Sequence, residues 1–362
     1  MIDDHAHPFA AQPGPFDPAG ISLDVLEDGG LEQRRRALGP TRLVQELLTV
    51  RLARRLGCDR RDVVEARTDA AADWPGYVSG LFRDAGIGGV ILDTGFGGEV
   101  AATVERCSEI SGASMHPIHR IEPTVDRLID QGATASDILG AVEAEMRAAA
   151  AAGAVGFKTI IAYRTGLAVD PSADLAQADA SLRAGGPVRR RGKACRDLVV
   201  RTALRIAAEL GTPFQFHTGF GDSDLRLAES NPLLLEDLLR SEEGSSVPIV
   251  LIHGSYPWHE ELAYLVMTKP NVHADVSLSN IFAPLTVADR LARILELAPA
   301  AKVLLGTDGH GEPETFWLGG RLLQEAWDET RARLSDAGAG NPWLDDVEDR
   351  IFERNARELY RL

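Results

Sequence analysis

Cysteine, positive charge and long apolar runs are the features that this sequence has least of. Its three cysteines, Cys58, Cys107 and Cys195, are scattered and form no CxxC pair. This pattern excludes a disulfide framework and a zinc site built from cysteines, and it is typical of reduced thiols in a cytosolic protein. No signal-like segment precedes Asp3, and no apolar run is long enough to span a bilayer. We therefore expect a cytoplasmic protein.

Basic residues are outnumbered by acidic ones. The chain has 38 Lys and Arg against 54 Asp and Glu, a net charge of −16, and its clearest basic run is Arg189-Arg190-Arg191. Such a surface repels phosphate backbones and gives no electrostatic attraction to an anionic membrane. We expect neither nucleic acid nor a membrane as a partner, and we expect a small molecule instead. The oligomeric state stays open, with a homo-oligomer as one alternative.

Short apolar runs, separated by longer helical patterns, make up most of the chain. Near-continuous apolar runs without alternation are typical of strands that are covered on both faces, as in parallel sheets. Amphipathic patterns between them predict helices over 137–152, 195–210, 260–267 and 288–297. The runs that we interpret as strands are 1–7, 88–95, 114–122, 154–161, 213–219, 248–254, 271–278 and 302–309. This alternation of strands and helices predicts an α/β fold, a (β/α)8 TIM barrel.

Two stretches are too long to be ordinary connections between a strand and its helix. Residues 17–84 follow the first predicted strand and look helical, and residues 165–195 follow the fourth. Both leave the carboxyl end of a strand, so we expect both insertions to sit over the mouth where barrel active sites form. Because no linker-like composition divides the chain, we interpret 1–362 as a single domain.

His5 and His7 stand two residues apart in the first predicted strand. Residues at this spacing point to the same face of a strand, roughly 6.6 Å apart along it. Two imidazoles in that arrangement can bind one metal ion. The alternative is a surface dipeptide near the terminus, because this pattern alone is weak.

Lone polar residues also close four other predicted strands. Lys158 lies in the fourth, His217 ends the fifth, His253 ends the sixth and Asp308 ends the eighth. Any one of them could be a core residue with satisfied hydrogen bonds. Together, all at the catalytic face of the predicted barrel, they indicate a metal site.

This set of residues resembles the amidohydrolase superfamily of metal-dependent TIM-barrel hydrolases. Its pattern is HxH on strand one, lysine on strand four, histidines on strands five and six, and aspartate on strand eight. The resemblance covers essentially the whole chain. More narrowly, the chain is similar to the amidohydrolase-related branch and, within it, to the FluG-type amidohydrolase domain, through the stretches DDHAHPF, GFKTIIAYRTGL, FQFHTGFGD and NARELYRL.

The resemblance implies a role for each matching residue. His5, His7, His217 and Asp308 would hold a divalent metal, most often Zn²⁺, with Mn²⁺ or Fe²⁺ as alternatives that the same ligands suit. Asp308 would orient the hydrolytic water, take its proton and pass it to the leaving group. His253 would complete a second metal site or stabilise the developing oxyanion as a hydrogen-bond donor.

Lys158 decides between one metal ion and two. In binuclear members of the superfamily a lysine on strand four is carbamylated and bridges both ions. In the amidohydrolase-related branch single-metal sites predominate, and Lys158 would then stay a cation that binds a substrate carboxylate. We favour the mononuclear, unmodified alternative.

Three further residues are candidates for binding the substrate. Tyr163 and Arg164 follow the fourth predicted strand, and Arg164 could clamp a carboxylate or form a salt bridge that fixes the insertion. Arg120 shares a predicted strand face with Glu122, so the two could line the pocket or pair with each other. His116, His119, His259 and His273 match no motif position and are interpreted as structural or exposed.

The sequence therefore predicts a metal-dependent hydrolase of a C–N bond, an amide of a small, carboxylate-bearing molecule. The FluG-type resemblance favours a γ-glutamyl-like amide. A metal-dependent non-oxidative decarboxylase, a chemistry also found in this branch, is the alternative. A catalytically silent metal-binding domain is a third, against which the complete ligand set argues.

Overall fold

Eight parallel strands form a barrel in the computed structural model, which describes residues 1–21, 23, 38–95 and 99–362. The strands are neighbours in chain order, each paired with the next. Hydrogen bonds from the Asp308 N–H to the His5 carbonyl and from the His7 N–H to the Gly309 carbonyl, both 2.8 Å, join the two ends of the sheet. The (β/α)8 fold is confirmed. The strands are β1 (Ile2–Ala6), β2 (Gly89–Asp93), β3 (Ser114–Arg120), β4 (Gly156–Thr159), β5 (Phe214–His217), β6 (Ile249–Ile252), β7 (Val272–Val276) and β8 (Val303–Leu305).

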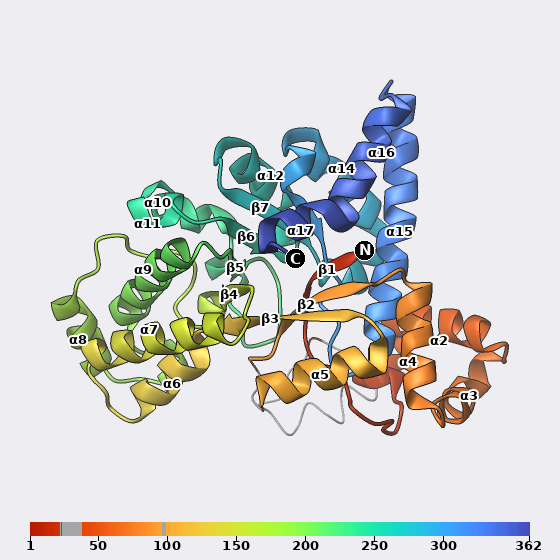
Figure 1. Cartoon of the computed structure of the whole chain (residues 1–362), viewed down its shortest axis with the longest axis horizontal. Coiled ribbons are helices and arrows are strands. Elements are labelled where there is room, and N and C mark those ends of the chain that lie inside the picture. Colours follow the sequence, from red (N-terminus) through yellow and green to blue (C-terminus); the bar gives the residue numbers. More distant parts are fainter. Residues whose placement is uncertain (22, 24–37, 96–98) are drawn as a thin grey trace.

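Helices surround the barrel on its outside, as the ribbon view shows (Figure 1). Those of the first half are α2 (Leu43–Leu56), α3 (Val63–Ala70), α4 (Trp74–Asp84), α5 (Val100–Ser111), α6 (Glu122–Asp130), α7 (Ala135–Ala151), α8 (Leu175–Arg183) and α9 (Lys193–Leu210). Those of the second half are α10 (Glu236–Arg240), α11 (Glu242–Ser245), α12 (His259–Thr268), α13 (Ser279–Phe282), α14 (Val287–Leu297), α15 (Pro313–Asp336), α16 (Asn341–Asp349) and α17 (Asn355–Tyr360).

Alternation along the strands separates an apolar outside from a partly polar inside. Phe157, Phe214 and Phe216 pack into the outer core against the helices, whereas their neighbours Lys158 and Gln215 are buried polar residues. Successive side chains of a strand point to opposite faces, so these polar groups face the barrel interior. The interior also contains an apolar cluster that packs against α17. The residues of this interior cluster are Ile2, Ile91, Ile118, Val250, Ile252, Leu304, Ala356 and Tyr360.

The first insertion contains α2, α3 and α4, as the helical pattern predicts, while its residues 22 and 24–37 lie outside the described part of the chain. It packs beside the mouth through Arg67 of α3. The Arg67 guanidinium contacts Glu312 at 3.0 Å and Glu314 at 2.7 Å, both in the segment that follows β8. Tyr77 of α4 donates a second hydrogen bond, 2.7 Å, to Glu314.

The second insertion contains α8 and contacts the loop that follows β5. Arg190 donates to Glu229 at 2.6 Å, and Arg189 lies 2.7 Å from Asp224. Both insertions thus contact loops that leave carboxyl ends of strands.

Cys58, Cys107 and Cys195 are free thiols. Among the described residues, no helix combines the length and the hydropathy that crossing a membrane requires.

We predict that Arg67→Ala lowers the free energy of unfolding by about 3–5 kcal/mol, because it leaves the buried Glu314 carboxylate without its cation. Urea unfolding followed by circular dichroism measures the change. Arg60→Ala is the matched control, since Arg60 forms an exposed ion pair with Glu46 in the same insertion and should change little. Equal effects of the two substitutions would contradict an anchoring role for Arg67.

Candidate metal centre

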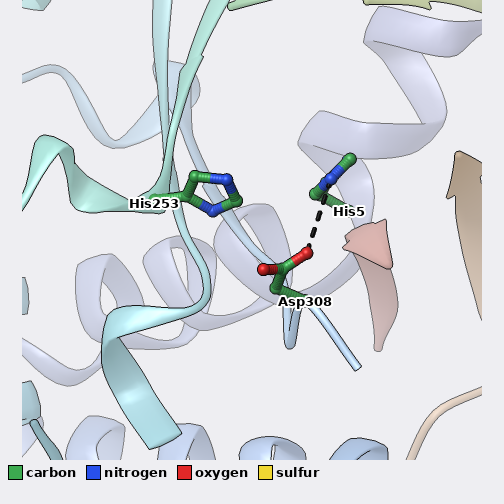
Figure 2. A group of neighbouring side chains, drawn as sticks. All are labelled: His5, His253 and Asp308. Carbon is green, nitrogen blue, oxygen red and sulfur yellow. Dashed lines mark ion pairs between the residues drawn. The ribbon is translucent and has the colours of Figure 1, made fainter. Parts of the chain in front are cut away.

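Four histidines and one aspartate meet at the carboxyl end of the barrel. His5 lies in β1 and His7 directly after it, His217 ends β5, His253 follows β6 and Asp308 follows β8. All five are buried, with exposed fractions of 8% or less. Figure 2 shows His5, His253 and Asp308 turned toward one another from three different strands. The residues that the sequence predicts as a site are therefore brought together.

Asp308 lies between the two histidines of the HxH pattern. Its Oδ1 is 3.5 Å from His5 Nε2 and 3.3 Å from His7 Nε2. One ligand atom each from His5, His253 and Asp308 lie within 4.8 Å of one another. His217 lies outside this group, but its ring centroid is 4.5 Å from that of His253. Within the 4.8 Å limit, the residue that joins His5 and Asp308 is therefore His253 and not His217.

The donor atoms fit a divalent metal ion. His7 Nδ1 is 3.0 Å from the Asp93 carbonyl, and since a carbonyl only accepts, His7 carries its proton on Nδ1 and presents an Nε2 lone pair. Within the described chain, His217 Nε2 and Asp308 Oδ1 are buried and have no hydrogen-bond partner. Uncharged imidazole nitrogens and a carboxylate oxygen, with open coordination capacity, are ligands that Zn²⁺, Mn²⁺ and Fe²⁺ all accept.

The environment keeps these imidazoles uncharged. Burial lowers the pKa of His5, His217 and His253 well below the usual range. The Lys158 ammonium adds to the effect at His5 and His217, and His217 itself adds to it at His253. A neutral ring is the form that binds a metal.

Two of the five residues have an unusual backbone. His253 has φ = 72° and Asp308 has φ = 53°, a left-handed conformation that costs a non-glycine residue roughly 1–2 kcal/mol. Specific hydrogen bonds hold both in place. The His253 N–H donates to Asp275 Oδ1 at 3.0 Å, and the Asp308 N–H donates to the His5 carbonyl. Such conformations cluster at functional sites, where the surrounding structure over-determines them.

Asp93, the last residue of β2, also belongs to the site, although the family pattern has no position on strand two. Its Oδ2 accepts from Arg120 Nε at 3.0 Å and lies 3.1 Å from Lys158 Nζ, while its Oδ1 accepts the Gly95 N–H at 2.9 Å. Burial opposes ionisation of Asp93, but Arg120 and Lys158 outweigh it and hold the pKa of this carboxyl well below its usual range. The sequence does indicate this residue, because Asp93 ends the apolar run GGVILD just as the candidate metal ligands end their own apolar runs.

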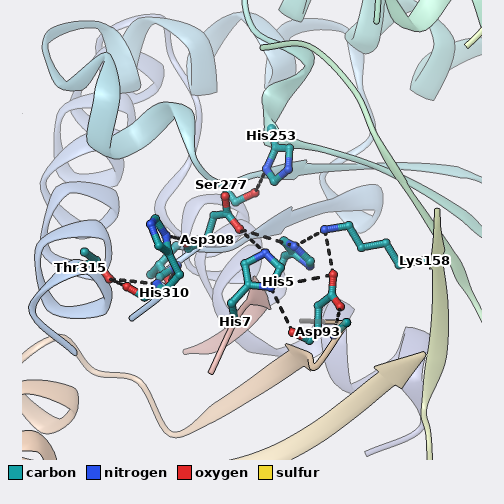
Figure 3. A network of polar contacts seen from close by, with 12 residues as sticks. His5, His7, Asp93, Lys158, His253, Ser277, Asp308, His310 and Thr315 are labelled. Carbon is teal, nitrogen blue, oxygen red and sulfur yellow. Dashed lines mark hydrogen bonds and ion pairs between the residues drawn. The ribbon is translucent and has the colours of Figure 1, made fainter. Parts of the chain in front are cut away.

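Lys158 is enclosed in this network. Its Nζ is 2.7 Å from His5 Nε2, and the side chain is 2% exposed. Burial lowers the pKa of Lys158, while Asp93 opposes that shift. Figure 3 shows Lys158 reaching across to Asp93 and His5 at the centre of the site.

The predicted substrate-binding residues divide into two groups. Tyr163 packs on His217, with ring centroids 4.6 Å apart, and its hydroxyl oxygen accepts the Asp222 N–H. Arg120 contacts Asp93 inside the site. Arg164 instead donates to Asp126 at 2.9 Å from a buried position, which is the salt-bridge alternative that fixes the insertion.

The interpretation of Arg120 and Glu122 as neighbours on one strand face is wrong. β3 ends at Arg120, and Glu122 is the first residue of α6. Strand alternation therefore no longer relates the two side chains. Glu122 instead accepts a hydrogen bond from the Thr159 hydroxyl.

Comparison with known proteins agrees with this geometry. Residues 2–362 match the family model described as amidohydrolase. The chain belongs to the amidohydrolase family. It is also 39% identical over 189 residues to protein fluG of Emericella nidulans, a match that covers 48% of this chain and 21% of fluG, so the chain aligns with about a fifth of that relative's length.

Solved structures share the fold of this amidohydrolase. A candidate metal-dependent hydrolase from Lactobacillus casei superposes with a TM-score of 0.88 at 24% identity, covering 100% of this chain and 95% of the other. Uronate isomerase from Thermotoga maritima superposes with a TM-score of 0.70 at 14% identity, covering 99% and 94%. At these identities the likeness establishes the barrel and not the reaction.

We predict that His5→Ala and Asp308→Asn each reduce the metal content of the amidohydrolase well below the expected content of about one ion per chain. Elemental analysis of protein purified without chelator measures it. His116→Ala is the matched control, since His116 lies on β3 and contacts Ser114. Full metal content in both site variants would show that the ion is held elsewhere.

We further predict that Lys158 is unmodified, so that Lys158→Met keeps the metal and binds it more tightly. The reason is that an ammonium 2.7 Å from His5 Nε2 repels a cation at that nitrogen. Chelator competition measures the affinity, with Lys193→Met as control, because Lys193 pairs with Asp197 in α9. A carbamylated Lys158 would be a metal ligand, and loss of metal in Lys158→Met would overturn the prediction.

Proposed function

We propose that this amidohydrolase is a metal-dependent hydrolase that cleaves an amide-type C–N bond in a small molecule bearing a carboxylate. The observation that carries the proposal is the position of Asp308. Its buried carboxylate lies beside His5 and His7, and Oδ1 has no hydrogen-bond partner within the described chain. A base in this position is poised for a proton that arrives only during the reaction.

A bound divalent metal would lower the pKa of a water molecule towards about 7 and polarise the scissile carbonyl. Its ligands would come from His5, His7, His217 and Asp308, with His253 for a second ion or for the same one. The identity of the ion is open, and Zn²⁺ is our first choice.

Asp308 carries the proton in the proposed reaction. Its carboxylate accepts a proton from the attacking water as the new C–O bond forms. It then donates that proton to the departing nitrogen as the C–N bond breaks. The products are a carboxylic acid and an amine, and Asp308 returns to its carboxylate form. General acid–base catalysis of this kind contributes about 10²–10⁴-fold.

A substrate carboxylate that does not react is suited to the side of the site formed by Lys158 and Arg120. Both cations contact Asp93, and a carboxylate that entered beside them would gain charge-assisted hydrogen bonds. Tyr163 packs against His217. The resemblance to FluG-type domains makes a γ-glutamyl-like amide the first candidate.

The test offers the metal-loaded enzyme three kinds of substrate: γ-glutamyl amides, hydroxybenzoate-type acids and uronates. Amine release, CO₂ release and sugar isomerisation are followed separately. We expect amine release alone, reduced at least about 100-fold in Asp308→Asn and unchanged in Asp59→Asn, which alters an exposed ion pair with Arg61. CO₂ without amine, abolished in Asp308→Asn, would replace the hydrolase with the decarboxylase alternative. Isomerisation alone would contradict both.

A further inference from the structure

His253 is held at one of its ring nitrogens, Nδ1, by a residue of the neighbouring strand's end. It follows β6 and opens the short turn His253–Ser255. Its Nδ1 lies 2.8 Å from the Ser277 hydroxyl oxygen, just beyond β7. Ser277 in turn contacts Asp275 of β7. His253 is 1% exposed, and Ser277 and Asp275 are fully buried, so these contacts are shielded from bulk solvent. Figure 3 shows Ser277 beside His253, between the imidazole and the rest of the site.

We propose that Asp275 and Ser277 are positioning residues that lock His253 in its Nδ1-protonated tautomer, so that Nε2 keeps its lone pair. None of the family motif positions includes Asp275 or Ser277.

The direction of the hydrogen bonds follows from counting protons. Asp275 Oδ1 accepts both the His253 N–H, at 3.0 Å, and the Ser277 hydroxyl. A serine hydroxyl has one proton to donate, and here it is committed to Asp275. The Ser277 oxygen can therefore only accept from His253, which requires a proton on Nδ1. A neutral imidazole has one ring proton, so Nε2 has none.

The direction depends on Asp275 Oδ1 acting as the acceptor of both donors, the His253 N–H and the Ser277 hydroxyl. A proton on Oδ2 would leave that arrangement unchanged. A proton on Oδ1 would reverse the chain and protonate Nε2, and the experiment below distinguishes the two.

This tautomer selects between the two roles that the family resemblance leaves open for His253, and this consequence rests on the proposed function. An Nε2 lone pair can bind a metal ion or take a proton. It cannot donate a hydrogen bond to an oxyanion. The structure therefore favours His253 as a ligand or base in the hydrolase.

Nitrogen NMR of the full chain, labelled with ¹⁵N-histidine and stripped of metal by chelator, tests the tautomer directly. Protonated and unprotonated ring nitrogens have widely separated ¹⁵N shifts, and His253→Gln identifies the His253 signals. We expect a protonated Nδ1 and an unprotonated Nε2 in the unsubstituted chain. In Ser277→Ala, where Nδ1 loses its acceptor, we expect the Nε2-protonated form to appear. Ser277→Thr, which keeps the hydroxyl, should restore the original spectrum.

Ser279→Ala is the matched control, because the Ser279 hydroxyl is buried nearby but has no hydrogen-bond partner in the described part of the chain. It should leave the tautomer unchanged. We also expect Ser277→Ala to weaken metal affinity about 10–100-fold in chelator competition. A protonated Nε2 in the unsubstituted chain, or a Ser277→Ala spectrum identical to it, would overturn the proposal. Neither result depends on which substrate is turned over, so failure here is distinct from failure of the proposed hydrolysis.

Discussion

The seam between β1 and β8 is the constraint on which the site depends. A barrel must join its first strand to its last, and here the join is made at the height of the metal centre by the Asp308 N–H on the His5 carbonyl. Asp3 reinforces it, because its carboxyl accepts the Thr307 N–H at 2.8 Å and the Thr307 hydroxyl at 2.5 Å. The backbone that closes the barrel therefore also sets the distance between the HxH histidines and Asp308. A change that opened the seam would separate the ligands.

The seam also gathers buried acids beneath the site. Burial raises the pKa of Asp3 and of Asp4 to about 7, and Asp308 and Asp3 respectively add to the effect. Such groups are costly to bury in their charged form unless a cation is near. Hydrogen bonds offset part of this cost, from Thr307 at Asp3 and from Tyr360 at Asp4, and both lower the pKa of the acid that they contact. The seam therefore accommodates its buried acids through hydrogen bonds.

The sequence predicts the barrel well because parallel strands buried on both faces leave a strong, local apolar signal. All eight expected strands coincide with observed ones to within a few residues, and the polar residues at their ends do meet. What the sequence does not show is contact between distant residues. Nothing local indicates that Arg164 pairs with Asp126, or that Ser277 supports His253. The register shift of β1 between Asp3 and Ala6, an extra residue that re-aims the side chains after it, has no local signature either. Asp93 differs, because its place at the end of an apolar run is visible in the sequence.

The residues that meet at the strand ends serve several chemistries, so the choice of substrate must come from the loops above them. The loop after β5 shows how closely such a loop can approach. A Cβ on Gly221 would lie 1.9 Å from the Tyr163 hydroxyl oxygen and 3.0 Å from His217 Nε2. Only glycine lets the backbone come this near to a candidate ligand. Tyr163 ties that backbone to the loop after β4 by accepting the Asp222 N–H. The wall of the site on this side is therefore main chain, which Tyr163 and two backbone hydrogen bonds, from Gly219 to Ser230 and from Phe220 to Tyr256, hold in place. A larger residue at position 221 would displace the Tyr163 hydroxyl and crowd His217 Nε2, so this wall and the candidate ligand are coupled. Specificity can vary while the catalytic centre stays the same only where a loop does not press on a ligand.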